Sequence, residues 1–83
     1  MTFTQLVVPQ RIRDLYETVL DEEGSRELAL LTVASELVDM GLITCADCPV
    51  LEEDGVYVTD MMKVLGFSEP DTYGRPVLMF AHL

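Results

Sequence analysis

Basic residues are scarce in this 83-residue chain, which has five Lys and Arg against 15 Asp and Glu and a formal net charge of −10. Proteins that bind DNA or RNA gain much of their affinity from Lys and Arg that displace counterions from phosphates. The few basic residues are also dispersed along the chain, at Arg11, Arg13, Arg26, Lys63 and Arg75. The composition therefore argues against direct binding to nucleic acid and, for the same electrostatic reason, against binding to an anionic membrane surface.

Long apolar runs are also missing. No run approaches the roughly 20 residues that span a bilayer, and the start, Met1-Thr2-Phe3-Thr4, lacks the basic and apolar regions of a secretory signal peptide. We therefore expect a cytoplasmic protein. Because the chain also lacks internal repeats and Pro-, Ser- or Gly-rich tracts, its length predicts one small globular domain over residues 1–83.

Catalytic and metal-binding signatures are sparse. Cys45 and Cys48 have the spacing of half a zinc site or of a redox pair, but zinc needs four ligands and His82 is the only other strong candidate. The neighbouring Asp47 would raise thiol pKa values, which disfavours redox chemistry. His82 has no nucleophile near it in sequence, and the isolated glycines form no phosphate-binding loop. We predict no cofactor, no metal within a monomer and no enzymatic activity; a metal shared by the two cysteines across an interface remains open.

The central element of the chain is predicted to be a mostly buried helix over about residues 26–41. Ser25 is a good N-cap, Glu27 lies where the positive end of the helix dipole favours it, and Gly41 can take the left-handed conformation that ends a helix. Its apolar positions are too numerous for a surface helix and include Leu28, Ala29, Leu30, Leu31, Val33, Ala34, Leu37, Val38 and Met40.

A first helix is predicted over about residues 9–23. Pro9 suits its first turn, and Gly24 is expected to end it. One apolar stripe is formed by Ile12, Leu15, Tyr16, Val19 and Leu20. Because Ser25 restarts the chain directly after Gly24, the two helices should form a hairpin with a very short turn.

The remaining segments predict a small antiparallel sheet over about residues 49–58 and 76–82. The first range is expected to be a hairpin with an acidic tip, and the second is a continuous apolar run. Residues 2–8 suit a short strand, although Thr4 could equally cap an early helical turn. A short third helix is predicted over about residues 60–65, with Gly66 as its stop. The predicted class is therefore α+β, a helical hairpin packed on this sheet.

Two groups of acidic residues are candidates for binding a partner. The first lies on the first helix, where carboxylates in the last turn oppose the negative end of the helix dipole and cost stability. A chain that keeps such charges favours a protein partner with a basic surface, although maintenance of solubility explains them equally well. The candidate residues are Asp14, Glu17, Asp21, Glu22 and Glu23 on the helix, and Glu52, Glu53 and Asp54 at the hairpin tip.

By size and charge, this acidic domain resembles the phage-encoded inhibitors of bacterial defence, including anti-CRISPR proteins and DNA mimics. The resemblance implies a non-catalytic inhibitor that occupies a nucleic-acid-binding surface of a CRISPR effector or nuclease in the cytoplasm of a bacterial host cell. The residues that would make this contact are the acidic ones named above.

A second resemblance is local. The segment from Asp54 to Pro70 reads DGVYVTDMMKVLGFSEP and is similar to the strand-helix-turn segment of phage antirepressor domains of the BRO-N type. It implies a transcription-related interaction module as the alternative function. The identity of the partner and the oligomeric state remain open.

Overall fold

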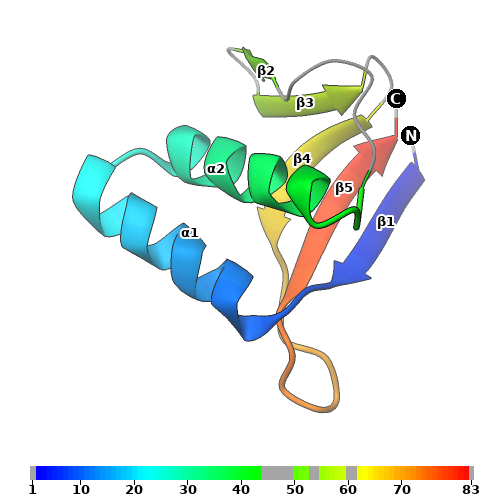
Figure 1. Ribbon diagram of the computed structural model, residues 1–83. Helices are drawn as coiled ribbons and strands as arrows, with labels where there is room; N and C mark the ends of the chain where they lie inside the picture. Colours follow the sequence, from blue (N-terminus) through cyan, green and yellow to red (C-terminus); the bar gives the residue numbers. More distant parts are fainter. Residues whose placement is uncertain (1, 44–49, 53–54, 60–61, 83) are drawn as a thin grey trace.

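The computed structural model describes residues 2–43, 50–52, 55–59 and 62–82. Two helices lie on one face of an antiparallel sheet whose strand order is β1-β5-β4-β3-β2 (Figure 1). The elements in chain order are β1 (Thr2–Val7), α1 (Gln10–Glu23), α2 (Arg26–Asp39), β2 (Val50–Glu52), β3 (Gly55–Thr59), β4 (Met62–Phe67) and β5 (Val77–His82). The α+β class and the helical hairpin on a sheet are confirmed.

The helical hairpin forms as its capping residues predict. Gly24 has a φ of 64° and donates its N–H to the Leu20 carbonyl, which ends α1. Ser25 then caps α2, because its side-chain oxygen accepts a hydrogen bond of 3.2 Å from the N–H of Leu28. Gly41, with a φ of 75°, follows the end of α2. The turn is therefore as short as the sequence indicates.

The hydrophobic core lies between the helices and the sheet. Buried side chains of α2 (Ala29, Leu30, Val33, Ala34 and Leu37) and of α1 (Ile12 and Tyr16) meet Val56, Val64, Leu78 and Phe80 from three neighbouring strands. The helix α2 packs against β2, β3 and β4, and α1 packs against α2. The central position predicted for the second helix is confirmed.

The short third helix predicted over residues 60–65 is wrong. Residues 60 and 61 lie outside the described part, but Met62–Phe67 form β4, which pairs with both β3 and β5. The side chain of Val64 is only 1 % exposed because it lies between Val56 and Phe80 in the register. The local pattern of such a short apolar run fits either a helix or a strand. Here the segment forms a strand because it pairs with a neighbouring strand on each side.

Gly66, which we expected to stop that helix, has another role. It lies at an irregularity in the β4–β5 register and has a φ of 137°. The guanidinium of Arg26, at the start of α2, donates a hydrogen bond to the neighbouring Leu65 carbonyl. A Cβ at Gly66 would lie 2.5 Å from the Arg26 Nη2, so glycine lets the arginine approach the strand.

The first segment of the chain adopts the strand rather than the helical turn. Throughout β1 the register with β5 is regular, from the Thr2–His82 pair to the Val7–Val77 pair. The predicted hairpin and C-terminal strand are also present, as β2, β3 and β5. A strand predicted from β-branched residues alone thus completes one edge of the sheet.

Candidate acidic binding surface

The acidic side chains that the structure describes lie on the helices and in one loop. Every Asp or Glu whose side chain is described lies on a helix or in the loop of residues 68–76, and none lies on a described strand side chain. These residues are Asp14, Glu17, Asp21, Glu22 and Glu23 on α1, Glu27, Glu36 and Asp39 on α2, and Glu69 and Asp71 in the loop. The sequence candidates on the first helix are thus all on the helical layer.

The densest group surrounds the turn between the helices. Asp21, Glu22 and Glu23 are exposed in the last turn of α1, which has no basic residue, and Glu27 is exposed in the first turn of α2. We call these four residues the hairpin cluster. They have no ion-pair partner within the described ranges, and Glu27 accepts a hydrogen bond of 3.4 Å from the Ser25 hydroxyl.

The other two candidates on α1 are engaged in local contacts. Asp14 accepts a hydrogen bond of 3.2 Å from the Gln10 amide, and Glu17 forms an ion pair of 3.0 Å with Arg13. Neutralisation by Arg13 weakens the field of Glu17 toward an external partner. Asp14 and Glu17 therefore differ from the hairpin cluster, because each has a partner on the same helix.

Arginine side chains are engaged away from the hairpin cluster. Arg11 pairs with Glu36 at 3.2 Å and thereby links α1 to α2, while Arg75 pairs with Asp71 at 2.7 Å. Arg13 also lies 4.8 Å from the centre of the Phe67 ring. Arg26 is directed to the Leu65 carbonyl, so none of the four arginines forms an ion pair with the hairpin cluster among the described contacts.

The side chains of the second predicted group, at the hairpin tip, lie outside the described part of the structure. Glu53 and Asp54 lie outside the described residues, and of Glu52 only the main chain is placed, where it pairs with Gly55 in the β2–β3 hairpin. Glu27 is the member of the hairpin cluster that the sequence analysis did not include among its candidate residues. The very short predicted turn could have found it, since such a turn brings the start of the second helix beside the end of the first.

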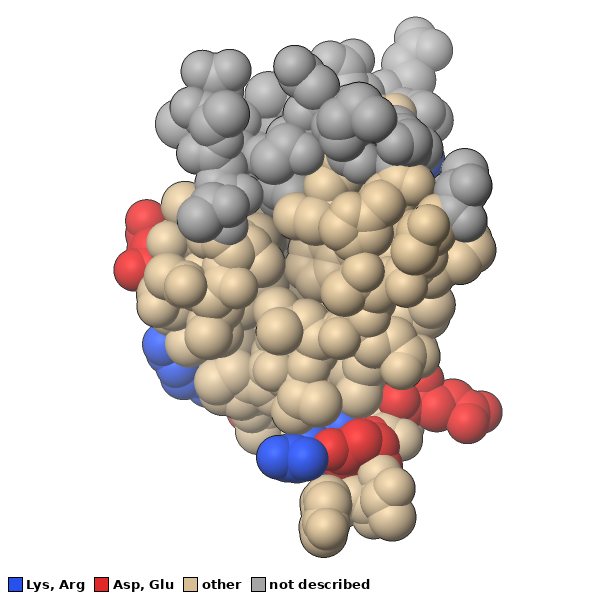
Figure 2. Space-filling view, turned by 90° about the vertical axis from the view of Figure 1, so that its right-hand side faces the viewer, with Lys and Arg blue, Asp and Glu red and all other residues tan. Residues whose placement is uncertain are grey.

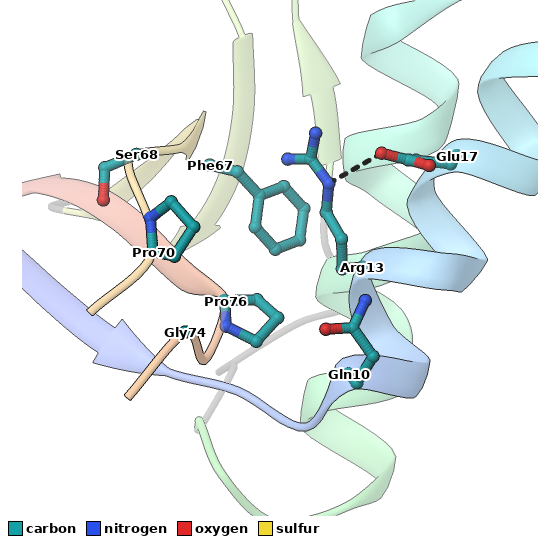
Figure 3. Close-up of a pocket in the computed structure, with 8 residues that line it drawn as sticks. All are labelled: Gln10, Arg13, Glu17, Phe67, Ser68, Pro70, Gly74 and Pro76. Carbon is teal, nitrogen blue, oxygen red and sulfur yellow. Dashed lines mark hydrogen bonds and ion pairs between the residues drawn. The ribbon is translucent and has the colours of Figure 1, made fainter. Parts of the chain in front are cut away.

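A shallow pocket of about 290 Å³ lies between the start of α1 and the 68–76 loop (Figure 3). The Phe67 ring and two prolines form its apolar wall, and the Arg13–Glu17 ion pair lies at its rim. The lining residues are Gln10, Arg13, Glu17, Phe67, Ser68, Pro70, Gly74 and Pro76. These side chains include no histidine or cysteine and no pair of carboxylates, so the pocket does not assemble an acid and a base for catalysis.

The loop beside this pocket is held by Asp71. Its carboxylate accepts hydrogen bonds from the N–H groups of Tyr73 (3.0 Å) and Arg75 (2.8 Å), in addition to the Arg75 ion pair. Loss of hydration acts to raise the pKa of Asp71, but the bonds from Arg75 and Tyr73 outweigh it and hold the pKa below its ordinary value of 3.8. Asp71 thus acts as a structural group.

The candidate metal ligands are not brought together in the described part of the chain. Cys45 and Cys48 fall outside it, and within it there is no group of three or more His, Cys, Asp and Glu side chains placed to hold a metal. His82 lies on β5, where its Nε2 is 2.6 Å from the Thr4 hydroxyl on β1. That contact gives the histidine a partner within the sheet.

Comparison of the chain with protein-family models, with curated proteins and with solved structures found no match. None of the described helices has the length and apolar character needed to cross a membrane.

Proposed function

We propose that this protein is a non-catalytic binding protein whose hairpin cluster contacts a basic surface on a nucleic-acid-binding protein. The observation that supports the proposal is the gathering of exposed, unneutralised carboxylates at one end of the helical layer. Three of them oppose the dipole of α1, a placement that costs about 0.3–1 kcal/mol per charge in exposed helices. A surface that concentrates charge in this way imitates the phosphates that a basic groove recognises.

The specific form of the proposal is an anti-CRISPR-like inhibitor that acts in the cytoplasm of a bacterial host. Its target would be the nucleic-acid-binding surface of a CRISPR effector or another nuclease, which the protein would occupy in stoichiometric amounts. Such an interaction forms fast at low salt, because opposite charges steer the encounter, and weakens as the Debye length falls to roughly 8 Å at physiological ionic strength.

The test is a competition experiment with purified CRISPR effectors and their DNA substrates. We expect the wild-type protein to displace DNA, and the triple variant Asp21→Lys, Glu22→Lys and Glu23→Lys to lose at least tenfold in affinity. A pair of single variants supplies the matched control: Glu22→Lys should weaken binding, whereas Glu69→Lys makes the same change of charge on the exposed 68–76 loop and should have little effect.

Two results would contradict the proposal. Inhibition that survives the triple reversal would place the contact on other residues. Tight binding of the protein itself to duplex DNA at physiological salt, seen in a gel shift, would instead favour the antirepressor-type function.

A further inference from the structure

The strand β1 forms one edge of the sheet and lacks the features that protect such edges from pairing. Natural edge strands are usually short, charged, interrupted by proline or distorted by a bulge. Residues Thr2–Val7 contain no charged residue and no proline, and their register with β5 is regular throughout. The opposite edge is different, because β2 has only three residues and packs against α2.

The hydrogen bonds to β5 show which main-chain groups of β1 point outward. The N–H of Val8 donates to the Pro76 carbonyl at 3.0 Å, so the even-numbered residues face β5 in the antiparallel ladder. The N–H and C=O groups of Phe3, Gln5 and Val7 therefore point away from the sheet. They form an alternating row of donors and acceptors to which another strand can pair.

The side chains of these same three residues lie on the sheet face away from the helices, since Leu6 packs toward the core. Phe3 is 57 % exposed and Val7 is 41 % exposed, so both are large hydrophobic side chains in contact with solvent. Figure 2 views the molecule from the right-hand side of Figure 1, and there the described charged side chains lie at the left and right margins and across the lower part, with an uncharged described surface between them.

We propose that β1 pairs with β1 of a second copy of this chain, antiparallel and in a register centred on Gln5. In that register Phe3 lies opposite the partner's Val7, Gln5 opposite the partner's Gln5, and Val7 opposite the partner's Phe3. Each of these pairs exchanges two main-chain hydrogen bonds. Aromatic and β-branched side chains are a favourable cross-strand combination, so the strand is complementary to itself.

The distribution of charge supports a second copy as the partner. The chain carries a net charge of −10, but the described carboxylates lie on the helices and the 68–76 loop. Two copies can therefore approach through β1 without placing any of the described carboxylates opposite one another. The uncharged strand offers nothing to a strongly basic partner, which the hairpin cluster would attract instead. Thr2 and Thr4 are exposed on the helix side of β1, so the helices do not cover this edge.

The experiment measures molar mass by light scattering or sedimentation over a wide range of protein concentrations. We expect the wild-type chain to reach twice the 9.3 kDa of one copy. Because Gln5 lies opposite itself, Gln5→Lys and Gln5→Glu each place like charges together, and each variant should remain a monomer. An equimolar mixture of the two variants should recover the dimer, since lysine then faces glutamate.

Thr18→Lys is the matched control, because it adds the same charge at an exposed site on α1 and should leave the dimer intact. Circular dichroism checks that the Gln5 variants, whose exposed side chain makes no core contact, keep their fold. A wild-type chain that stays monomeric at all concentrations would overturn the proposal. So would a dimer that survives both Gln5 variants, or a mixture that fails to recover it. The experiment uses no effector, so its outcome is independent of the proposed inhibitory function.

Discussion

At the scale of single residues, the contact between Arg26 and β4 connects the helical layer to the sheet. It requires a close approach of the guanidinium to the Leu65 carbonyl, and glycine at position 66 leaves the necessary space. The φ of 137° at Gly66 is also a conformation that residues with a side chain rarely adopt. Gly66 is therefore needed for its backbone conformation, and a Cβ at this position would also displace the end of the flexible Arg26 side chain.

We predict that Gly66→Ala lowers the free energy of unfolding by about 1–3 kcal/mol, the usual cost of a residue forced into a sparsely populated backbone region. Urea denaturation measures the change. In the Arg26→Ala background the same substitution should cost less, because the steric part disappears and the backbone part remains. Equal costs in the two backgrounds would show that the arginine does not crowd this position. Gly74→Ala provides a comparison, since Gly74 has a positive φ but no neighbour near its Cβ position.

The Asp71 carboxylate is the one described group whose pKa is clearly shifted. We expect its NMR titration midpoint to lie below 3.8 and to rise toward that value in Arg75→Ala, because the ion pair and the guanidinium hydrogen bond are lost. A lowered pKa in the folded state means that ionised Asp71 stabilises the fold above the unfolded pKa and loses this effect as the pH falls through the folded pKa. The stability difference between wild type and Asp71→Asn should therefore shrink with acid; a difference that is unchanged down to that range would contradict this account.

At the scale of secondary-structure elements, α2 is the helix that contributes most to the hydrophobic core. Leu37 is completely buried, whereas Leu28 on the same helix is 38 % exposed. We predict that Leu37→Ala lowers the free energy of unfolding by about 2–5 kcal/mol, and that Leu28→Ala costs less than about 1 kcal/mol. Chemical denaturation of both variants is the measurement. Similar losses from the two substitutions would mean that α2 is not the buried centre of the domain.

At the scale of the whole molecule, the structure separates an acidic helical layer from an uncharged sheet edge. The hairpin cluster at one end is the surface that we propose binds a basic partner, and β1 at the other side is the edge that we propose pairs with a second copy. The two surfaces use different elements, so a dimer would present two hairpin clusters at once. Bivalent presentation of this kind strengthens binding to a target that itself has two basic sites within reach.

Confinement of the charge also predicts how salt affects stability. The described carboxylates repel one another, and the ion pairs of Arg11, Arg13 and Arg75 offset part of this repulsion. We expect the melting temperature to rise when ionic strength increases from about 0.01 M to about 0.1 M, as the Debye length falls from roughly 30 to 10 Å. The triple lysine variant of Asp21, Glu22 and Glu23 should respond less to salt. A melting temperature that falls with added salt would show that attractive pairs dominate.

Much of the helical layer followed from local signals. Ser25 and Gly24 define the ends of two helices through their own side-chain and backbone chemistry, and the apolar spacing of each helix sets its buried face. The acidic residues of α1 could also be placed together for this reason, because residues near one another in a helix stay near one another in space. Glu27 lies near them because the turn between the two helices is short.

The tertiary structure decided what depends on partners distant in sequence. Met62–Phe67 became a strand because β3 and β5 flank it, and β1 met β5 from the other end of the chain. Strand pairing depends on segments that are far apart in the sequence. A local sequence pattern therefore predicts neither the sheet order nor the outward direction of the main-chain groups of Phe3, Gln5 and Val7. The same holds for Arg26, whose guanidinium donates a hydrogen bond to the Leu65 carbonyl of β4, far away in the sequence. The sequence by itself determined the helices and their charge, and only packing determined which charges were left unpaired and which edge was left open.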